Sequence, residues 1–200
     1  MLFRSSPGKA SDLEIKKIAD PAKYDPERIK RLLHSPNEPD STNLHEGVHA
    51  LNSELSDEFF FAHPELRRPE GNGIMGHGYT AVYLGDGEYA MIKKTPFKSR
   101  ELASYIPREF QNGRFSTYIS GPPGQYDAAQ NIFNEYSAYQ AATQHRINAG
   151  DELGSLNNYL ASNSQFGVFA VAGGMKLQRE APDYWNSDAG KQYKRSEEHT

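Results

Sequence analysis

Residues 39–57 read Pro-Asp-Ser-Thr-Asn-Leu-His-Glu-Gly-Val-His-Ala-Leu-Asn-Ser-Glu-Leu-Ser-Asp, and the interpretation of the whole chain depends on this stretch. The residues at 40–42 are types that cap helix N-termini. Apolar residues then recur at spacings of four, three and four, which is the period of an amphipathic helix: Leu44, Val48, Leu51 and Leu55. The pattern predicts a helix from about residue 41 to residue 57, with its apolar face against a core.

A second stripe on the same helix is polar and contains two histidines. It is offset by one residue, or about 100° of rotation, and consists of His45, His49, Asn52 and Ser56. Residues four apart on a helix have Cβ atoms roughly 5–6 Å apart, so the two imidazoles can bind one metal ion. The alternative is a solvated polar face. Glu46 lies between the histidines in the sequence and favours the metal site.

A catalytic zinc usually takes three protein ligands and leaves its fourth position to water. The best candidate for the third ligand is Glu135. It lies in a stretch from Asp127 to about Asn148 that has helical composition, with Asp127 as a cap and Gly150 as a stop. Glu135 and Tyr139 are four residues apart, so they share one face of this predicted helix.

Together, His45-Glu46-x-x-His49 and the downstream Asn134-Glu135-x-x-x-Tyr139 resemble the two zinc-binding helices of the gluzincin metallopeptidases. The resemblance covers two short motifs of the 200-residue chain. It implies that His45, His49 and Glu135 are ligands of a Zn²⁺ ion and that Glu46 is the general base. It also implies a catalytic role for Tyr139, either beside a ligand or as an oxyanion donor.

Other residues remain open for these roles. His63 and His77 lie in or beside a stretch rich in Pro and Gly, residues 62–78, and are alternative metal ligands. Tyr136 and His77 are alternative oxyanion donors. The candidates for hydrogen-bond partners of the imidazole N–H groups are Asn52, Asn134 and Asp127.

Between the two helices the sequence predicts a β-hairpin. Its strands are Tyr79–Leu84 and Glu88–Lys93, and its turn is Gly85-Asp86-Gly87. In zincins an edge strand near the active-site helix commonly binds extended substrate, so this hairpin is a candidate peptide groove. The alternative is that the hairpin only covers the core.

The remaining pattern mixes helices and strands, which indicates an α+β fold. Residues 99–105 predict a short helix that ends before Pro107, and residues 114–120 predict another strand. Residues 155–180 contain a stripe that predicts a buried helix ended by Pro182: Phe166, Phe169, Ala170, Gly173 and Leu177. We expect this helix to pack behind the two zinc-binding helices of a zincin-like domain.

Composition narrows the range of partners. The net charge is −4 and the pI about 6.0, and no basic stripe is interleaved with aromatic residues, so we expect no nucleic-acid partner. The absence of cysteine excludes disulfides and thiol chemistry. The chain has neither a signal-peptide apolar region nor a run of about 20 apolar residues, which predicts a soluble protein without membrane contact. Its compartment stays open, including secretion if the N-terminus is incomplete.

Three regions follow from this interpretation. Residues 1–40 are a polar N-terminal segment that wraps the domain, and residues 41–194 are the metallohydrolase domain, truncated at its C-terminal end. Residues 195–200, Arg-Ser-Glu-Glu-His-Thr, resemble the translation of a sequencing adaptor and are expected to be an artefact.

The function expected is a zinc-dependent metallopeptidase in which Glu46 activates a water molecule to hydrolyse peptide bonds. Its partner is a peptide or protein substrate. Two alternatives are kept: an inactive zincin-like domain that binds peptides, and a zinc hydrolase that does not act on peptides. The cleavage specificity and the oligomeric state stay open.

Overall fold

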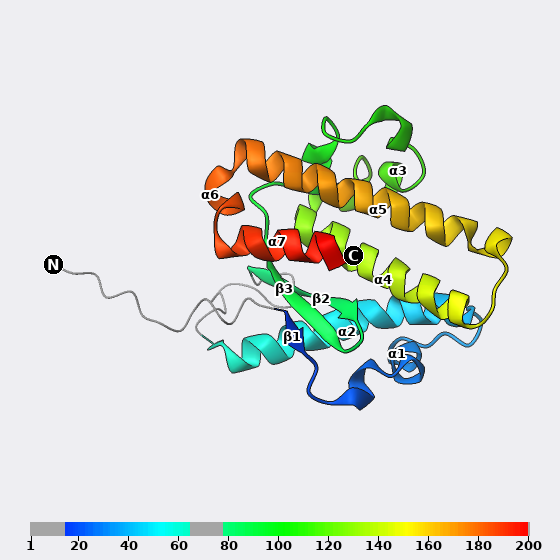
Figure 1. The fold of residues 1–200 in the computed structure, drawn as a ribbon. Coiled ribbons are helices and arrows are strands. Elements are labelled where there is room, and N and C mark those ends of the chain that lie inside the picture. The colour runs from blue at the N-terminus through cyan, green and yellow to red at the C-terminus, as the bar shows by residue number, and fades with distance from the viewer. Residues whose placement is uncertain (1–14, 65–77, 200) are drawn as a thin grey trace.

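The computed structural model describes residues 15–64 and 78–199 as a mixed helical fold with one small antiparallel sheet (Figure 1). Three long helices dominate it: α2 (Asp40–Ala62), α4 (Ala128–Asn148) and α5 (Leu153–Glu180). The sheet has the strand order β1-β3-β2 and is formed by β1 (Lys16–Lys17), β2 (Tyr79–Gly85) and β3 (Glu88–Lys93). The architecture is therefore α+β, as expected.

The shorter elements connect and cover these helices. The α-helices among them are α1 (Pro26–Leu32), α3 (Arg114–Tyr118), α6 (Pro182–Trp185) and α7 (Asp188–His199). Single 3₁₀ turns occur at Pro21–Tyr24, Ser99–Leu102, Arg108–Phe110 and Pro122–Gln125. The helix expected at residues 99–105 is thus a 3₁₀ turn over its first four residues. None of the described helices has a stretch apolar and long enough for a membrane span.

The helix predicted over residues 41–57 is confirmed, and it continues to Ala62 because Phe59 and Phe60 are also buried. The four apolar residues predicted to face the core are all buried: Leu44, Val48, Leu51 and Leu55. None of the predicted capping side chains caps the helix. Pro39 occupies the N-cap position, and the Asp40 carboxylate lies 2.9 Å from the Lys30 ammonium of α1.

Gly47 explains how α1 reaches α2. A Cβ atom at Gly47 would lie 2.0 Å from the backbone carbonyl oxygen of Ile29, so only a residue without a side chain permits this approach. Ile29 is buried in the same apolar cluster as Val48 and Leu51. The described part of the N-terminal segment therefore packs on the domain through α1, and through the pairing of β1 with β3.

The predicted hairpin is confirmed, with the register Tyr79↔Lys93 to Tyr83↔Tyr89. All three turn residues, Gly85 to Gly87, have positive φ. The prediction that a peptide binds at the edge of the hairpin is wrong for the outer edge of β2. The outward backbone N–H groups of Ala81 and Tyr83 donate to Ser56 Oγ at 2.9 Å and to Asn52 Oδ1 at 2.7 Å, so α2 already occupies that edge. The hairpin covers the core.

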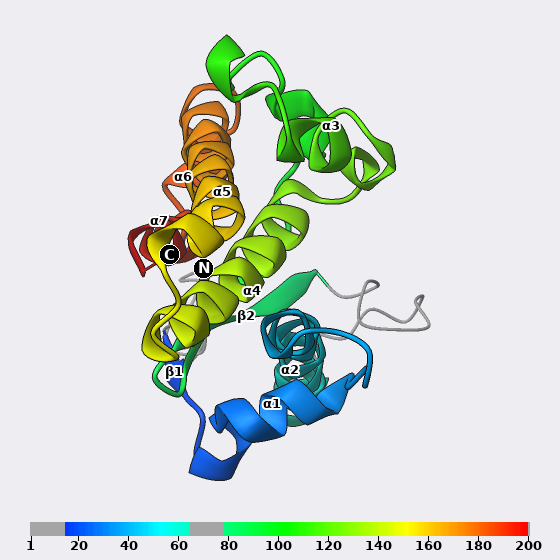
Figure 2. The same cartoon turned by 90° about the vertical axis from the view of Figure 1, so that its right-hand side faces the viewer.

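Helices α4 and α5 are also confirmed. Asp127 caps α4 by accepting a hydrogen bond from the backbone N–H of Gln130 at 3.0 Å. The stripe predicted for α5 is buried, and its Phe166 ring stacks on Tyr139 of α4. In Figure 2, α4 lies between α5 and α2, so α5 packs behind the α2–α4 pair as expected.

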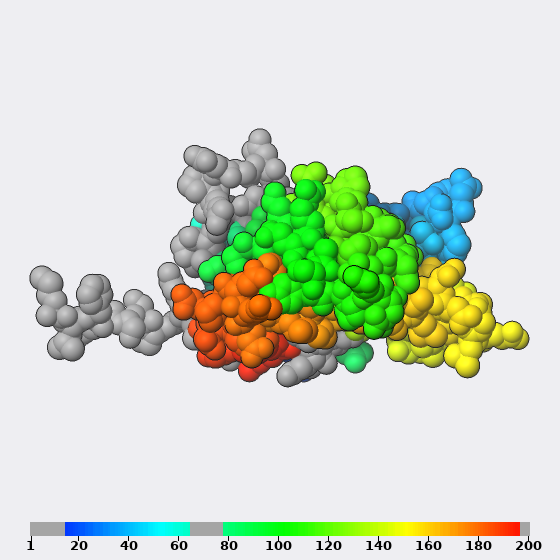
Figure 3. Space-filling view, turned by 90° about the horizontal axis from the view of Figure 1, so that it is seen from above, coloured from blue at the N-terminus to red at the C-terminus, as the bar shows by residue number. Residues whose placement is uncertain are grey.

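The strand predicted at residues 114–120 is wrong, because residues Arg114–Tyr118 form the short helix α3. Its aromatic and β-branched residues favour a strand, but no edge of β2 is open to receive one. Local hydrogen bonds form instead, from Ser116 N to Gly113 O and from Ile119 N to Phe115 O. Seen from above, the segment that carries α3 (green) forms the surface beside the orange end of α5 (Figure 3).

Candidate metal centre

Helices α2 and α4 bring His45, His49 and Glu135 together from positions far apart in the sequence. The two helices pack side by side (Figure 2) and are joined by Asn52, whose amide donates to Asn134 Oδ1 at 2.6 Å and to Ser137 Oγ at 3.3 Å. Because these bonds lie on the same face of α2 as the histidines, they fix the distance between the imidazoles and the carboxylate.

The donor atoms have the spacing of ligands around one ion. The two Nε2 atoms are 3.2 Å apart, His45 Nε2 lies 3.6 Å from Glu135 Oε2, and His49 Nε2 lies 3.6 Å from Glu135 Oε1. Ligand atoms about 2.0–2.1 Å from a tetrahedral zinc are roughly 3.3–3.4 Å from one another. The cluster therefore has room for one ion of this size at its centre.

The contacts between the Nε2 atoms and the carboxylate are longer than hydrogen bonds, so Glu135 Oε2 has no partner, and the Nδ1 atoms on the other side of each imidazole have none either. Glu135 Oε2, His45 Nδ1 and His49 Nδ1 are buried and make no hydrogen bond. An unpartnered buried polar atom is costly. A metal ion bound to the carboxylate and the Nε2 atoms would satisfy Glu135 Oε2, so the donor set fits a cation better than it fits a closed hydrogen-bond network.

The cluster is partly accessible. The side chains of His45, His49 and Glu135 are 11%, 19% and 17% exposed. A metal at this position would therefore be held by three half-buried side chains and still be reached by water. Three protein ligands would leave one coordination position of a four-coordinate ion open to that water.

Charge and hydrogen bonding keep Glu135 ionised. Burial raises the pKa of Glu135, but contact with His45 and His49 and a hydrogen bond from Tyr118 outweigh it, and the pKa lies below its usual value. The same bond contributes to the raised pKa of the Tyr118 phenol, after the larger effect of burial. The carboxylate is therefore the charged form that a cation requires.

Tyr139 lies beside the cluster, on the same face of α4 as Glu135. Its ring centre is 4.4 Å from that of His45, at an angle of 65°. Burial is the main cause of the raised pKa of Tyr139. Tyr139 therefore packs against the His45 ring and helps to hold it in place.

The three glutamates of α2 differ in their surroundings. Glu46 is exposed on the turn that carries His45, and among the described residues it has no hydrogen bond or ion pair. Glu54 pairs with Arg28 at 2.8 Å, and Glu58 pairs with Lys23. Glu46 is thus the glutamate of this helix that is not committed to the fold.

Several sequence candidates do not join the cluster. His63 is at the C-cap of α2, fourteen residues after His49 and therefore about 21 Å along the helix axis. Asn52 and Asn134 bond to each other, and Asp127 caps α4, so none of these three bonds to an imidazole. His77 lies outside the described residues.

Tyr136 points into a different part of the molecule. It lines a pocket between α4 and α5 with Val171 and Met175, and it is not among the residues of the metal cluster.

Two residues of α3 lie at the site and were missed by sequence analysis. Tyr118 lies close enough to Glu135 for each to shift the pKa of the other, and Arg114 lies over the Tyr139 ring, with 4.8 Å between the guanidinium carbon and the ring centre. The composition of this segment predicts a strand, in which two residues four apart are far from each other along the chain axis. In α3 the spacing of Arg114 and Tyr118 directs both side chains to one side.

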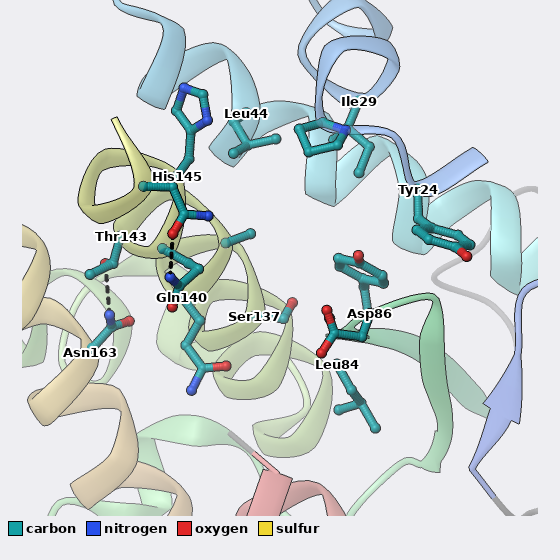
Figure 4. A pocket seen from close by; sticks show the side chains of 16 residues that line it. Tyr24, Ile29, Leu44, Leu84, Asp86, Ser137, Gln140, Thr143, His145 and Asn163 are labelled. Carbon is teal, nitrogen blue, oxygen red and sulfur yellow. Dashed lines mark hydrogen bonds between the residues drawn. The ribbon is translucent and has the colours of Figure 1, made fainter. Parts of the chain in front are cut away.

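A pocket of about 660 Å³ lies on neighbouring faces of the same helices, and the cluster residues do not line it (Figure 4). Leu44 of α2 and Ser137 of α4 contribute to its wall, with Tyr83 and Asp86 from the hairpin. The candidate metal cluster and this cavity are therefore separate features.

No protein-family model, curated protein or solved structure matches the chain.

Proposed function

We propose that the chain is a zinc-dependent metallopeptidase of the gluzincin type with a zincin-like arrangement of its two metal-binding helices. The convergence of His45, His49 and Glu135, with one donor atom of each residue within 4.8 Å of the others, carries this proposal. The same three residues stand at the positions of the H-E-x-x-H and Asn-Glu-x-x-x-Tyr motifs. Motif and geometry therefore support the same chemistry.

Zinc is the metal that this donor set favours. Two imidazole nitrogens and one carboxylate oxygen are borderline ligands, and three protein ligands leave a fourth position open. Bound there, zinc would lower the pKa of a coordinated water towards about 7 and polarise a carbonyl group.

The chain's own residues supply the proton transfer and the positioning. The Glu46 carboxylate accepts a proton from the attacking water and returns it to the leaving amine. Its exposed position beside His45, without an ion pair among the described residues, leaves it available for this role. Tyr139 acts through His45 by holding the imidazole ring against α4.

Metal stoichiometry on purified protein tests the site directly. We expect one zinc per chain in the wild type and loss of tight binding in His49→Ala and Glu135→Ala. The matched controls are His145→Ala and Glu54→Ala, which remove the same residue types from outside the cluster. Full zinc occupancy in Glu135→Ala would rule out the third ligand.

Cleavage of a peptide library, with and without a chelator, tests the reaction. We expect chelator-sensitive cleavage, and a loss of at least about 10²-fold in Glu46→Gln at unchanged zinc content. Binding of peptides without cleavage would instead indicate the inactive binding domain. Chelator-sensitive hydrolysis of esters alone would indicate a non-peptidase hydrolase.

A further inference from the structure

Arg114 places a positive charge close to the metal cluster. Its guanidinium carbon is 4.8 Å from the centre of the Tyr139 ring, and that centre is 4.4 Å from the His45 ring centre. The guanidinium therefore lies within about 9 Å of the His45 ring. Arg114 is half-buried at the start of α3, so its charge is only partly screened by water.

No carboxylate of the described residues lies within ion-pair distance of this guanidinium. Arg28 pairs with Glu54 and Arg146 pairs with Asp151, whereas Arg114 makes no ion pair within residues 15–64 and 78–199. Its side chain is nevertheless held in place. The Nε–H group donates to Ser162 Oγ at 3.0 Å, and the guanidinium rests on Tyr139.

The bond to Ser162 uses the Nε–H group of Arg114, and the ring of Tyr139 covers one face of the guanidinium. The two terminal amino groups can therefore donate to another acceptor. Such a planar fork matches a carboxylate, and its pre-organisation reduces the entropy lost on binding. An extended peptide advances about 3.3–3.6 Å per residue, so 9 Å corresponds to between two and three residues. The 9 Å is an upper bound, because it adds two centre-to-centre distances, and the contact between guanidinium and carboxylate spans part of it. A peptide bond at the metal would therefore bring a carboxylate one or two residues away within reach of Arg114.

We propose that Arg114 binds a substrate carboxylate one or two residues from the scissile bond, so that the preferred substrates are peptides with a carboxylate at that place. This inference rests on the proposed peptidase function. The carboxylate belongs either to the peptide C-terminus or to an acidic side chain, and both present the same two oxygens to the guanidinium.

Equilibrium binding to zinc-loaded Glu46→Gln protein tests the inference without turnover. The first pair of ligands is an N-acetylated tripeptide with a free C-terminal carboxylate and its C-terminal amide. The second pair consists of amidated tripeptides that differ by Glu against Gln. We expect the carboxylate-bearing member of one pair to bind at least about tenfold more tightly, and the responsive pair identifies the source of the carboxylate.

The same measurement in Glu46→Gln/Arg114→Gln assigns the preference. In this double variant we expect the ratio of the two affinities to fall to about one. In Glu46→Gln/Arg108→Gln, which removes an exposed arginine outside α3, we expect the preference for the carboxylate to persist. A preference that survives in Arg114→Gln would mean that the carboxylate binds elsewhere, for example at the metal, and would overturn the inference. If that variant does not fold, Arg114→Met removes the charge and keeps a long side chain that can pack on Tyr139, and an undiminished preference there has the same meaning.

The two proposals fail in different assays. A wild-type protein that cleaves no peptide contradicts the peptidase function. A protein that cleaves peptides but shows no Arg114-dependent preference contradicts only the inference about the carboxylate.

Discussion

The Tyr118 hydroxyl of α3 lies beside the Glu135 carboxylate of α4 and helps to lower its pKa, so a residue outside the two candidate metal-binding helices acts on the third candidate ligand. A hydrogen bond ties the same tyrosine to α4, because Asn131 Nδ2 donates to the Tyr118 carbonyl oxygen at 3.0 Å. The position of α3 is therefore coupled to the geometry of the metal cluster.

Removing this hydroxyl should weaken the metal site while leaving the fold intact. Outer hydrogen bonds to metal ligands typically contribute 10–100-fold in affinity, so we expect Tyr118→Phe to weaken zinc binding by roughly tenfold or more in a chelator-competition titration. Tyr126→Phe removes a hydroxyl from an exposed tyrosine and is the matched control. Equal zinc affinity in Tyr118→Phe and the wild type would show that Glu135 needs no such support.

The middle residue of His-Glu-Gly-Val-His has a structural role of its own. A Cβ at Gly47 would meet the Ile29 carbonyl at 2.0 Å, and this neighbour is backbone that cannot rotate away. We expect Gly47→Ala to lower the free energy of unfolding by about 1–3 kcal/mol, measured by chemical denaturation, because α1 must move away from α2.

Gly154→Ala is the control for this substitution. It lies in the first turn of α5, and no atom lies within 4 Å of the position of its Cβ. The added methyl group should stabilise that helix by up to about 1 kcal/mol. An equal effect of the two substitutions would mean that the approach of α1 does not depend on Gly47.

The long helices and the residues of the candidate metal cluster could be predicted from sequence because the signal is local. The stripe from Leu44 to Leu55 has a helical period, and Asp127 caps α4 as its position indicates. Once both helices are assigned, His45, His49 and Glu135 fall on single faces. The two motifs identify these three residues, but whether their side chains come together depends on how α2 packs on α4.

Features that depend on tertiary contacts could not be predicted in the same way. The segment 114–118 has strand-forming composition, yet it forms a helix, and this change brings Tyr118 and Arg114 to the site. Likewise, the edge of β2 was expected to be open. Nothing local to β2 indicates that Asn52 and Ser56, far away in the sequence, bond to its backbone.

Asn52 connects three elements and should therefore be sensitive to substitution. It accepts from Tyr83 N at 2.7 Å and donates to Asn134 and Ser137. Asn52→Ala leaves the buried Tyr83 N–H without a partner, and we expect a loss of about 1–3 kcal/mol in the free energy of unfolding. Asn148→Ala, at the exposed end of α4, should change it by less than about 0.5 kcal/mol. Similar losses in the two variants would contradict the connecting role of Asn52.

Asp127 makes stability depend on pH in a defined window. Burial raises its pKa to about 6 from an ordinary value of 3.8, although it accepts hydrogen bonds from Gln130 N and Thr95 Oγ1. Between about pH 4 and pH 6 the folded protein retains a proton that the unfolded chain has released, so this group's contribution to stability falls as the pH rises through that window. Below the window both states are protonated, and above it both are ionised.

Asp127→Asn keeps a capping oxygen and removes the titration. Relative to the wild type, the free energy of unfolding of this variant should therefore rise by on the order of 2 kcal/mol between pH 4 and pH 6 and stay level above that range. The other carboxyl groups, whose lowered pKa values make stability rise with pH, contribute equally to the variant and the wild type. Their contribution therefore cancels in the difference between the two free energies of unfolding. Urea denaturation at closely spaced pH values measures it, and Asp183→Asn, which removes an exposed carboxyl of α6, is the control for the loss of a charge. A difference that stays constant across the window would mean that Asp127 is hydrated in the folded protein, and that capping α4 does not bury a charge.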